Sequence, residues 1–243
     1  MSAGATPVGV PGTDVQVVVL PDGTPWRTDP QVRTAVAATV TTVLLDGAAD
    51  GTAVGALPDA PRPARVDALV ATLLAPGCHT VPVGAGRVGV SASHEAGRTY
   101  VAVAPDAVVV DACALDRWAQ VDAVLDDAFT AAEREALRTP WDRVRAWTAL
   151  ECAVKAGRAD LLRPHEREPL VALGADGRPV VPGDGVGLHL VRHEGRLRAV
   201  CVRVALVAPV DAPATGDGTR TVAPTVTGPL TAAAGRALVG ART

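Results

Sequence analysis

Residues 139–157 read TPWDRVRAWTALECAVKAG, and residues 29–47 read DPQVRTAVAATVTTVLLDG. Each stretch begins with a capping residue, continues with proline at the first helical position and ends with glycine. These are standard helix start and stop signals, so both stretches are predicted to be helices of equal length. One of the two helices falls in each half of the chain.

A hairpin is also predicted in each half. The turn His94-Glu95-Ala96-Gly97-Arg98 leads into TYVAVA, and His193-Glu194-Gly195-Arg196 leads into LRAVCVRVA. Alternating, valine-rich segments after such turns are typical of β-strands. Because the helix and the hairpin both recur, the sequence predicts a pseudo-duplicated α+β fold of two subdomains, each with helices packed on a small antiparallel sheet. Chance similarity of the two halves is the alternative.

The boundary between the halves is expected at Pro105-Asp106, because proline ends a strand ladder and a turn must follow. The predicted N-terminal half is therefore 1–104, and the C-terminal half is 105–208. Residues 209–243 are rich in Ala, Thr, Gly and Pro and have little periodicity, so we expect a loosely ordered tail.

Two shorter helices are expected between these elements. One is a short apolar helix near Val66 to Leu74. The other is opened by Thr130 and Glu133, which have the spacing of a capping box, and it should end near Leu137.

The bulk composition argues against several classes of partner. The 243 residues carry a net charge of -3 and only 2% aromatic side chains, so neither a nucleic-acid surface nor a base-stacking platform is indicated. No apolar run reaches the ~20 residues that span a bilayer, and the first residues do not resemble a secretory signal. We therefore expect a cytoplasmic monomer with no nucleic-acid or membrane partner. The four cysteines form no Cys-x-x-Cys pair, so reduced thiols are expected.

Lys155 is the only lysine among 23 cationic side chains. An ammonium on a flexible stem can donate or relay a proton and guanidinium cannot replace it there, so this lysine is a candidate for chemistry. The alternative is chance in an arginine-rich chain. Along the predicted helix Val144, Trp147, Thr148, Glu151 and Lys155 share one face, which should point inward.

A carboxylate and an amine on an inward face need an explanation. One is an ordinary i,i+4 pair of Glu151 and Lys155, worth ~0.3–0.5 kcal/mol. The other involves Asp111, which follows the apolar run 108–110 and is expected to project from the end of a buried strand. The alternative for Asp111 is that it only forms a turn after the strand. In the second explanation Asp111 and Glu151 hold a hard cation, and Lys155 neutralises or protonates a phosphate leaving group.

These segments resemble the 4′-phosphopantetheinyl transferases, specifically the larger surfactin-type branch. The resemblance covers roughly residues 88–207. It rests on four motifs that agree in order and spacing: Ser91-x-Ser93-His94, Val110-Asp111, Phe129-Thr130-x-x-Glu133-x-x-x-Leu137 and Trp147-Thr148-x-x-Glu151-x-x-x-Lys155.

The resemblance implies a pseudo-dimeric α+β fold with a site in the cleft between the halves. It implies transfer of phosphopantetheine from coenzyme A to a serine of an acyl or peptidyl carrier protein, with magnesium as cofactor and 3′,5′-ADP as leaving group. By resemblance, Asp111 and Glu151 would be magnesium ligands, and Glu151 would also be a general base. Lys155 would contact the pyrophosphate, and Ser93 and His94 would help to seat coenzyme A.

The chain departs from the family pattern at two positions near these residues. Cys113 replaces a second carboxylate, and a thiol is a soft ligand poorly matched to magnesium. Leu150 replaces a lysine, so one cation near the phosphates is missing. In the first half, the helix 29–47 carries only Arg33 where relatives are basic, and a Gly-Lys-Pro element before the Ser/His turn is absent.

Two hypotheses follow from the motifs and the departures. The first is an active transferase with a reduced metal shell. The second is a degenerate member of the family without transfer activity, which binds a carrier protein or is adapted to another reaction in a biosynthetic pathway.

Overall fold

The computed structural model of the protein describes residues 14–49, 61–161, 163–174, 179–181 and 185–207. One compact unit ends at Val207, and the predicted boundary at Pro105-Asp106 falls inside it. The predicted tail, 209–243, lies outside the described residues.

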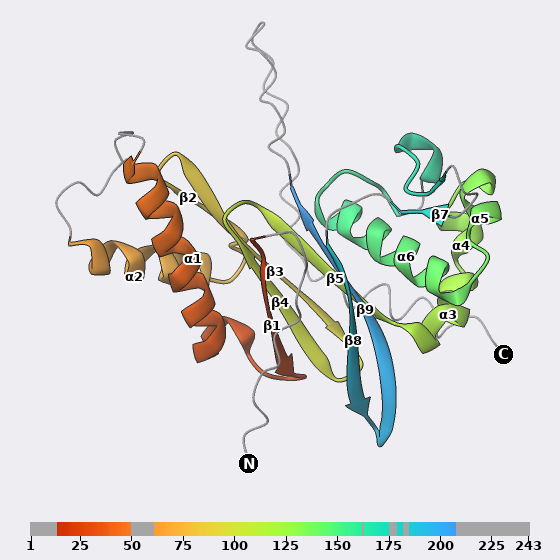
Figure 1. Ribbon diagram of the computed structural model, residues 1–243, viewed down its shortest axis with the longest axis horizontal. Helices are drawn as coiled ribbons and strands as arrows, with labels where there is room; N and C mark the ends of the chain where they lie inside the picture. Colours follow the sequence, from red (N-terminus) through yellow and green to blue (C-terminus); the bar gives the residue numbers. More distant parts are fainter. Residues whose placement is uncertain (1–13, 50–60, 162, 175–178, 182–184, 208–243) are drawn as a thin grey trace, which may run out of the picture. The chain divides into compact units, whose positions relative to one another are not determined.

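The first half builds a four-stranded antiparallel sheet in the order β1-β4-β3-β2 (Figure 1). Its strands are β1 (Gln16–Pro21), β2 (Thr80–Val83), β3 (Gly86–Glu95) and β4 (Arg98–Ala104). The predicted hairpin at 94–98 is confirmed: it joins β3 to β4, and Gly97 adopts a φ of 68°, which glycine takes without steric cost.

Two helices pack on one face of this sheet, α1 (Pro30–Ala49) and α2 (Arg62–Leu73), preceded by a short 3-10 turn, η1 (Trp26–Thr28). Asp29 caps α1, since its Oδ1 accepts the backbone N–H of Gln31 at 2.8 Å. The predicted helix is confirmed, but the stop at Gly47 is wrong, because α1 continues through it to Ala49. Glycine weakens a helix by only about 1 kcal/mol, so it need not end one.

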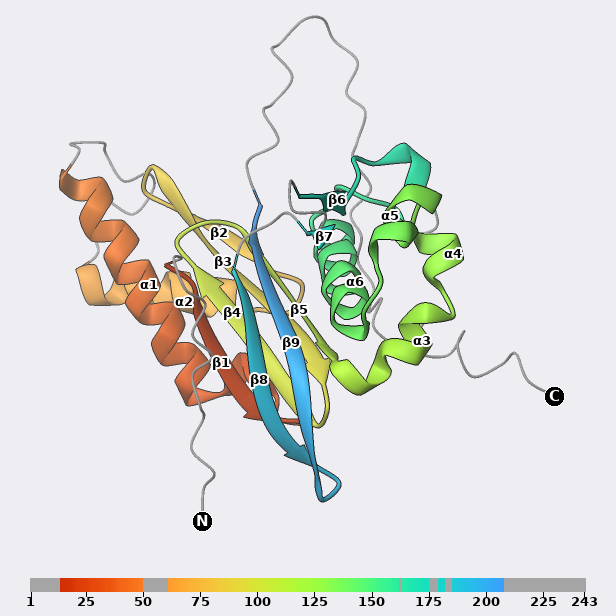
Figure 2. The same cartoon turned by 45° about the vertical axis from the view of Figure 1, so that its right-hand side comes forward.

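The second half builds a three-stranded antiparallel sheet in the order β5-β9-β8 and a small two-stranded sheet, β6-β7. Their strands are β5 (Val108–Ala114), β6 (Ala172–Leu173), β7 (Pro179–Val180), β8 (Val186–His193) and β9 (Arg196–Leu206). The intervening helical segments are η2 (Leu115–Arg117), α3 (Trp118–Asp122), α4 (Leu125–Ala128), α5 (Ala131–Ala136), α6 (Pro140–Lys155) and η3 (Pro164–Glu166). Figure 2 shows α6 beside β5 and β9, which it contacts.

The start and end of α6 are those predicted. Thr139 accepts the backbone N–H of Asp142, while the Asp142 carboxylate accepts the Thr139 N–H, which makes a capping box. Gly157 follows the helix with a φ of 69°. The predicted capping box of Thr130 and Glu133 is confirmed at the start of α5.

Strand alternation divides the interior into three apolar clusters. The first lies between the two sheets and combines alternate residues of β1, β4, β5, β8 and β9, including Tyr100, Val110 and Val202. The second joins the first sheet to α1 and α2. The third joins the other face of β5 and β9 to α3–α6. Helices thus cover the outer face of each sheet, while the inner faces share a core.

The predicted α+β class with antiparallel sheets is confirmed. The pseudo-duplication stays a prediction. Within the described residues, no helix is long and apolar enough to cross a membrane.

Candidate functional site

Asp111 lies in the middle of β5, directly opposite Arg203 of β9. The prediction that it projects from the end of a strand is therefore wrong. The segment Ala112-Cys113-Ala114 continues the strand, because it pairs with residues 200–202 of β9. Asp111 is 6% exposed, and its side chain lies on the face of the sheet that carries α6.

Lys155, at the end of α6, binds Asp111. Its Nζ donates to Asp111 Oδ1 at 2.9 Å and to the backbone carbonyl of Val110 at 2.8 Å. The two side chains are mostly shielded from water. The last turn of α6 is therefore joined to β5 by a mostly buried ion pair and a second hydrogen bond.

Glu151, one turn before Lys155 on α6, completes a cluster of three charged groups. Burial, and then the negative charge of Asp111, raise the pKa of the Glu151 carboxyl to about 7, although Lys155 acts in the opposite direction. Burial alone would lower the pKa of Lys155, but the charge and hydrogen bond of Asp111, together with the charges of Cys152 and Glu151, outweigh it and the net shift is upward. At neutral pH Lys155 is therefore charged, while the Glu151 carboxyl is about half ionised.

Ser93 and His94 do not lie together, because successive residues of a strand point to opposite faces. Ser93 is 4% exposed; its Oγ donates to Asp111 Oδ1 at 3.0 Å and accepts the backbone N–H of Ala112 at 3.2 Å. His94 is exposed on the other face, where its Nδ1 lies 2.9 Å from Thr99 Oγ1 and 3.5 Å from Asp22 Oδ1. The structure brings Ser93, but not His94, to the charged cluster.

Cys113 and Leu150, the two departures from the family pattern, pack in the same apolar cluster. They are 3% and 0% exposed. Burial, followed by the charges of Glu95 and Asp111, raises the pKa of the Cys113 thiol far above its ordinary value. Cys113 is thus a neutral core residue, and a charged residue at either position would enter an apolar environment.

The donor set allows a test of the expected magnesium site. Magnesium is usually held by one or two carboxylates together with substrate phosphates and water. Asp111 and Glu151 are hard oxygen donors whose mutual repulsion a divalent cation would relieve. In the described part of the chain, no group of three His, Cys, Asp or Glu side chains could hold a metal. These residues therefore fit a magnesium ion shared with a substrate's phosphates, and not one held by protein ligands alone.

Two other motif residues have structural roles. Glu133 forms a buried pair with Arg167, with Oε1 2.9 Å from Nη1, and also accepts the backbone N–H of Leu170. The hydroxyl of Thr148 donates to the Arg145 carbonyl and lies 3.7 Å from Cys201 Sγ. Glu133 thus joins α5 to the segment 167–170, and Thr148 joins α6 to β9.

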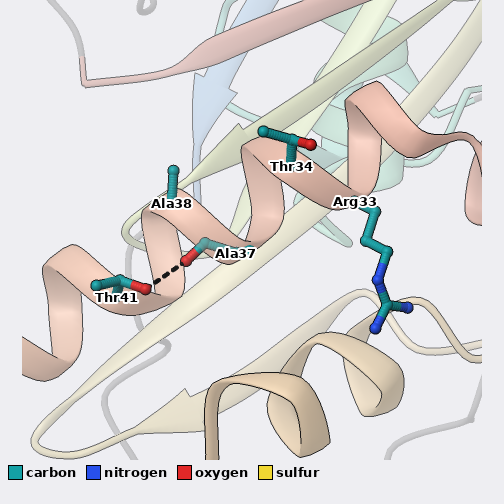
Figure 3. A pocket seen from close by; sticks show the side chains of 5 residues that line it. All are labelled: Arg33, Thr34, Ala37, Ala38 and Thr41. Atoms are coloured by element: carbon teal, nitrogen blue, oxygen red, sulfur yellow. Dashed lines mark hydrogen bonds between the residues drawn. The ribbon is translucent and has the colours of Figure 1, made fainter. Parts of the chain in front are cut away.

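Two shallow grooves lie elsewhere, along α1. One is lined by Arg33, Thr34, Ala37, Ala38 and Thr41 (Figure 3). The other lies between α1 and β1. Arg33, the only cation of this helix, is 3.7 Å from Asp67 of α2. Neither groove includes a residue of the charged cluster.

Arg203 belongs to this region and is included in none of the four motifs. Arg203 is 1% exposed and faces the same side of the sheet as Asp111. An arginine inside the apolar run VCVRVA was a visible signal, because a charge in a buried strand requires a partner. Its position opposite Asp111, in contrast, depends on the pairing register of two distant strands.

Comparisons with known proteins add no family to this description. No protein-family model matches the chain, and no curated protein matches it.

Proposed function

We propose that the protein is a 4′-phosphopantetheinyl transferase that moves phosphopantetheine from coenzyme A to a serine of an acyl or peptidyl carrier protein. One observation carries the proposal: Asp111 of β5 meets Lys155 of α6 at 2.9 Å, with Glu151 in electrostatic contact with both. Three of the charged residues in the family-like motifs thus form one cluster. A cytoplasmic location is part of the proposal.

Glu151 would act as the general base. A carboxyl group with a pKa of about 7 is half ionised at neutral pH, so it can accept the proton of the attacking serine hydroxyl. The oxygen of that serine then bonds to the β-phosphorus of coenzyme A, and the bond to the leaving 3′,5′-ADP breaks.

Lys155 would supply positive charge beside the pyrophosphate. Its raised pKa favours this electrostatic role over donation of a proton. Asp111 would hold Lys155 and, with Glu151, a magnesium ion. When bound, that ion would neutralise the negative charge that develops on the phosphate oxygens.

The test is a carrier-modification assay. Purified protein, coenzyme A, magnesium and an apo carrier protein should give a carrier whose intact mass has increased by one phosphopantetheine group. The rate should rise with pH as Glu151 ionises. Because a bound magnesium ion favours the ionised carboxylate, the rate should level off below the pKa of about 7 that Glu151 has in the metal-free protein. No mass gain with several carriers, under conditions where an established transferase modifies them, would reject the proposal.

Substitution of the lone lysine sharpens this test. Lys155→Arg keeps the charge, but guanidinium is larger and planar and cannot reproduce the two short contacts to Asp111 and Val110. We expect transfer to fall by about 10²-fold, the scale for loss of a preorganised electrostatic group. Full activity in this variant would show that transfer does not depend on the two short contacts of the Lys155 ammonium group.

A second candidate is a family member that binds a carrier protein without transferring the group. The packing of Cys113 and Leu150 in one apolar cluster favours it, because the family has charged residues at these positions. Carrier binding measured by calorimetry, together with an unchanged carrier mass, would support this second candidate.

A further inference from the structure

Strands β3 and β5 belong to different sheets, yet they are joined through side chains. Gly89, Ser91 and Ser93 alternate on the face of β3 that meets β5. Ser91 Oγ accepts the backbone N–H of Val110 at 3.1 Å, and Ser93 Oγ accepts that of Ala112 at 3.2 Å. Two backbone donors on one side of β5 thus find buried hydroxyl acceptors instead of a further strand. We refer to Gly89, Ser91 and Ser93 as the serine seam.

The two serines differ in one respect. A hydroxyl has one proton to donate. Ser93 donates its proton to Asp111 Oδ1 at 3.0 Å, the same oxygen that accepts from Lys155 Nζ. For the Ser91 hydroxyl, the described part of the chain supplies one hydrogen bond, from the Val110 N–H. Ser93 therefore connects the seam to the charged cluster, whereas Ser91 serves the seam.

We propose that Ser93 is a positioning residue, which holds the carboxylate of Asp111 in the orientation that binds Lys155. Its own orientation is set by the Ala112 N–H, so the first sheet controls a carboxylate of the second. The consequence for catalysis rests on the proposed transferase function, but the positioning itself does not. This role differs from the seating of coenzyme A that the motif resemblance implies.

The chain offers a probe that does not depend on activity. Lys155 is the only lysine, so full-length protein labelled with [¹⁵N]lysine gives a single side-chain ammonium signal in NMR. Ser93→Ala should shift this signal and speed its hydrogen exchange with water about 10-fold, because a charge-assisted contact to Asp111 loosens. Ser91→Ala is the matched control. It also leaves one N–H of β5 without its acceptor, on the residue whose carbonyl Lys155 contacts, but it should shift the ammonium signal much less than Ser93→Ala does, because Ser93, and not Ser91, donates to Asp111.

Kinetics give the second reading. If transfer occurs, Ser93→Ala should lower kcat about 10-fold and leave the KM for coenzyme A within about twofold, as expected when a group that orients catalytic residues is lost. A raised KM with unchanged kcat would instead assign Ser93 to coenzyme A binding and overturn the inference.

The NMR result decides the inference even in an inactive protein. An unmoved Lys155 signal in Ser93→Ala, or equal shifts in both serine variants, would reduce Ser93 to a structural contact and overturn the inference. If Ser93→Ala does not fold, Ser93→Cys keeps the size and only a weak donor, and should shift the signal in the same direction. Absence of transfer with a selective shift in Ser93→Ala would reject the proposed function while supporting the positioning role.

Discussion

Helices α1 and α6 start with equivalent signals and differ in what they turn toward their sheets. The inward stripe of α1 is Val32, Val36, Val40, Val43 and Leu44, all buried. The stripe of α6 begins with Val144 and Thr148 and then places Glu151 and Lys155 beside the sheet, where Lys155 binds Asp111. An ionised group beside a sheet costs desolvation energy that an apolar stripe avoids. Such a departure from optimal packing is expected at functional sites, which makes α6 the helix to examine for chemistry.

The largest effect on stability is expected when a charged residue is placed on the inward face of α1 and an apolar residue on that of α6. Val36→Asp would place an unpaired carboxylate at a position that is 0% exposed, and should cost about 4 kcal/mol or more in the free energy of unfolding. Glu151→Val should instead be neutral or stabilise the fold by about 1 kcal/mol, because it removes a shielded carboxyl beside Asp111.

Denaturant unfolding monitored by circular dichroism measures both changes. Val36→Asn, which adds polarity but no charge, is the control for Val36→Asp. A large destabilisation by Glu151→Val would contradict the comparison, because it would make the carboxyl a stabilising part of the fold.

A smaller effect is expected in the pH dependence of stability. The pKa of Glu151 is raised to about 7 in the folded protein, so the folded state binds its proton more tightly than the unfolded state does. The resulting stabilisation is fully present below about pH 4.5 and is lost as the pH rises through 7. At about 1.4 kcal/mol per pKa unit, the shift from 4.5 to about 7 corresponds to a loss of at most about 3.5 kcal/mol, and solvent screening makes the measured loss smaller.

The variant Glu151→Gln lacks this titrating carboxyl, so its comparison with the native chain separates the contribution of Glu151 from that of the other ionisable groups. The difference in unfolding free energy between the native chain and the variant should change between pH 4.5 and 7.5. A difference that is constant over this range would refute the assignment of a raised pKa to Glu151.

The smallest effect concerns the helix starts, where the two helices should behave alike. Asp29→Ala at α1 and Thr139→Ala at α6 each remove a side chain that accepts a backbone N–H of the first turn. Each should cost about 1 kcal/mol. Exposed Thr34→Ala, inside α1, is the control and should change little. Costs that differ by more than about twofold between the caps would show that the helices are less equivalent than their signals indicate.

The parts of the fold that depend on local signals could be predicted from the sequence. The caps at Thr130 and Thr139 and the turn at Gly97 need only neighbouring residues, and they are confirmed. The position of Asp111 could not be predicted, because Ala112 and Ala114 have little intrinsic strand propensity and are held in β5 by pairing with β9.

The parts of the candidate site that depend on local spacing could also be predicted, and the contacts between distant elements could not. Helical spacing alone put Glu151 and Lys155 on one face, but the contact between Lys155 and Asp111 spans distant elements. The contact of Ser93 with Asp111 depends on two sheets meeting, for which no local signal exists. Motif order suggested that these residues act together, and only the tertiary structure shows which of them are in contact.

Gly89 shows how an absent side chain can govern a charged one. A Cβ at this position would clash with the Asp106 carbonyl oxygen and lie 2.8 Å from the Val108 nitrogen, both of them backbone atoms. Glycine is therefore required for clearance, and not for an unusual φ. A methyl group at residue 89 would push the start of β5 away from β3. The distance between Ser93, four residues further along β3, and Asp111 of β5 would then increase. The geometry of the charged cluster thus depends partly on Gly89, a residue that has no side chain.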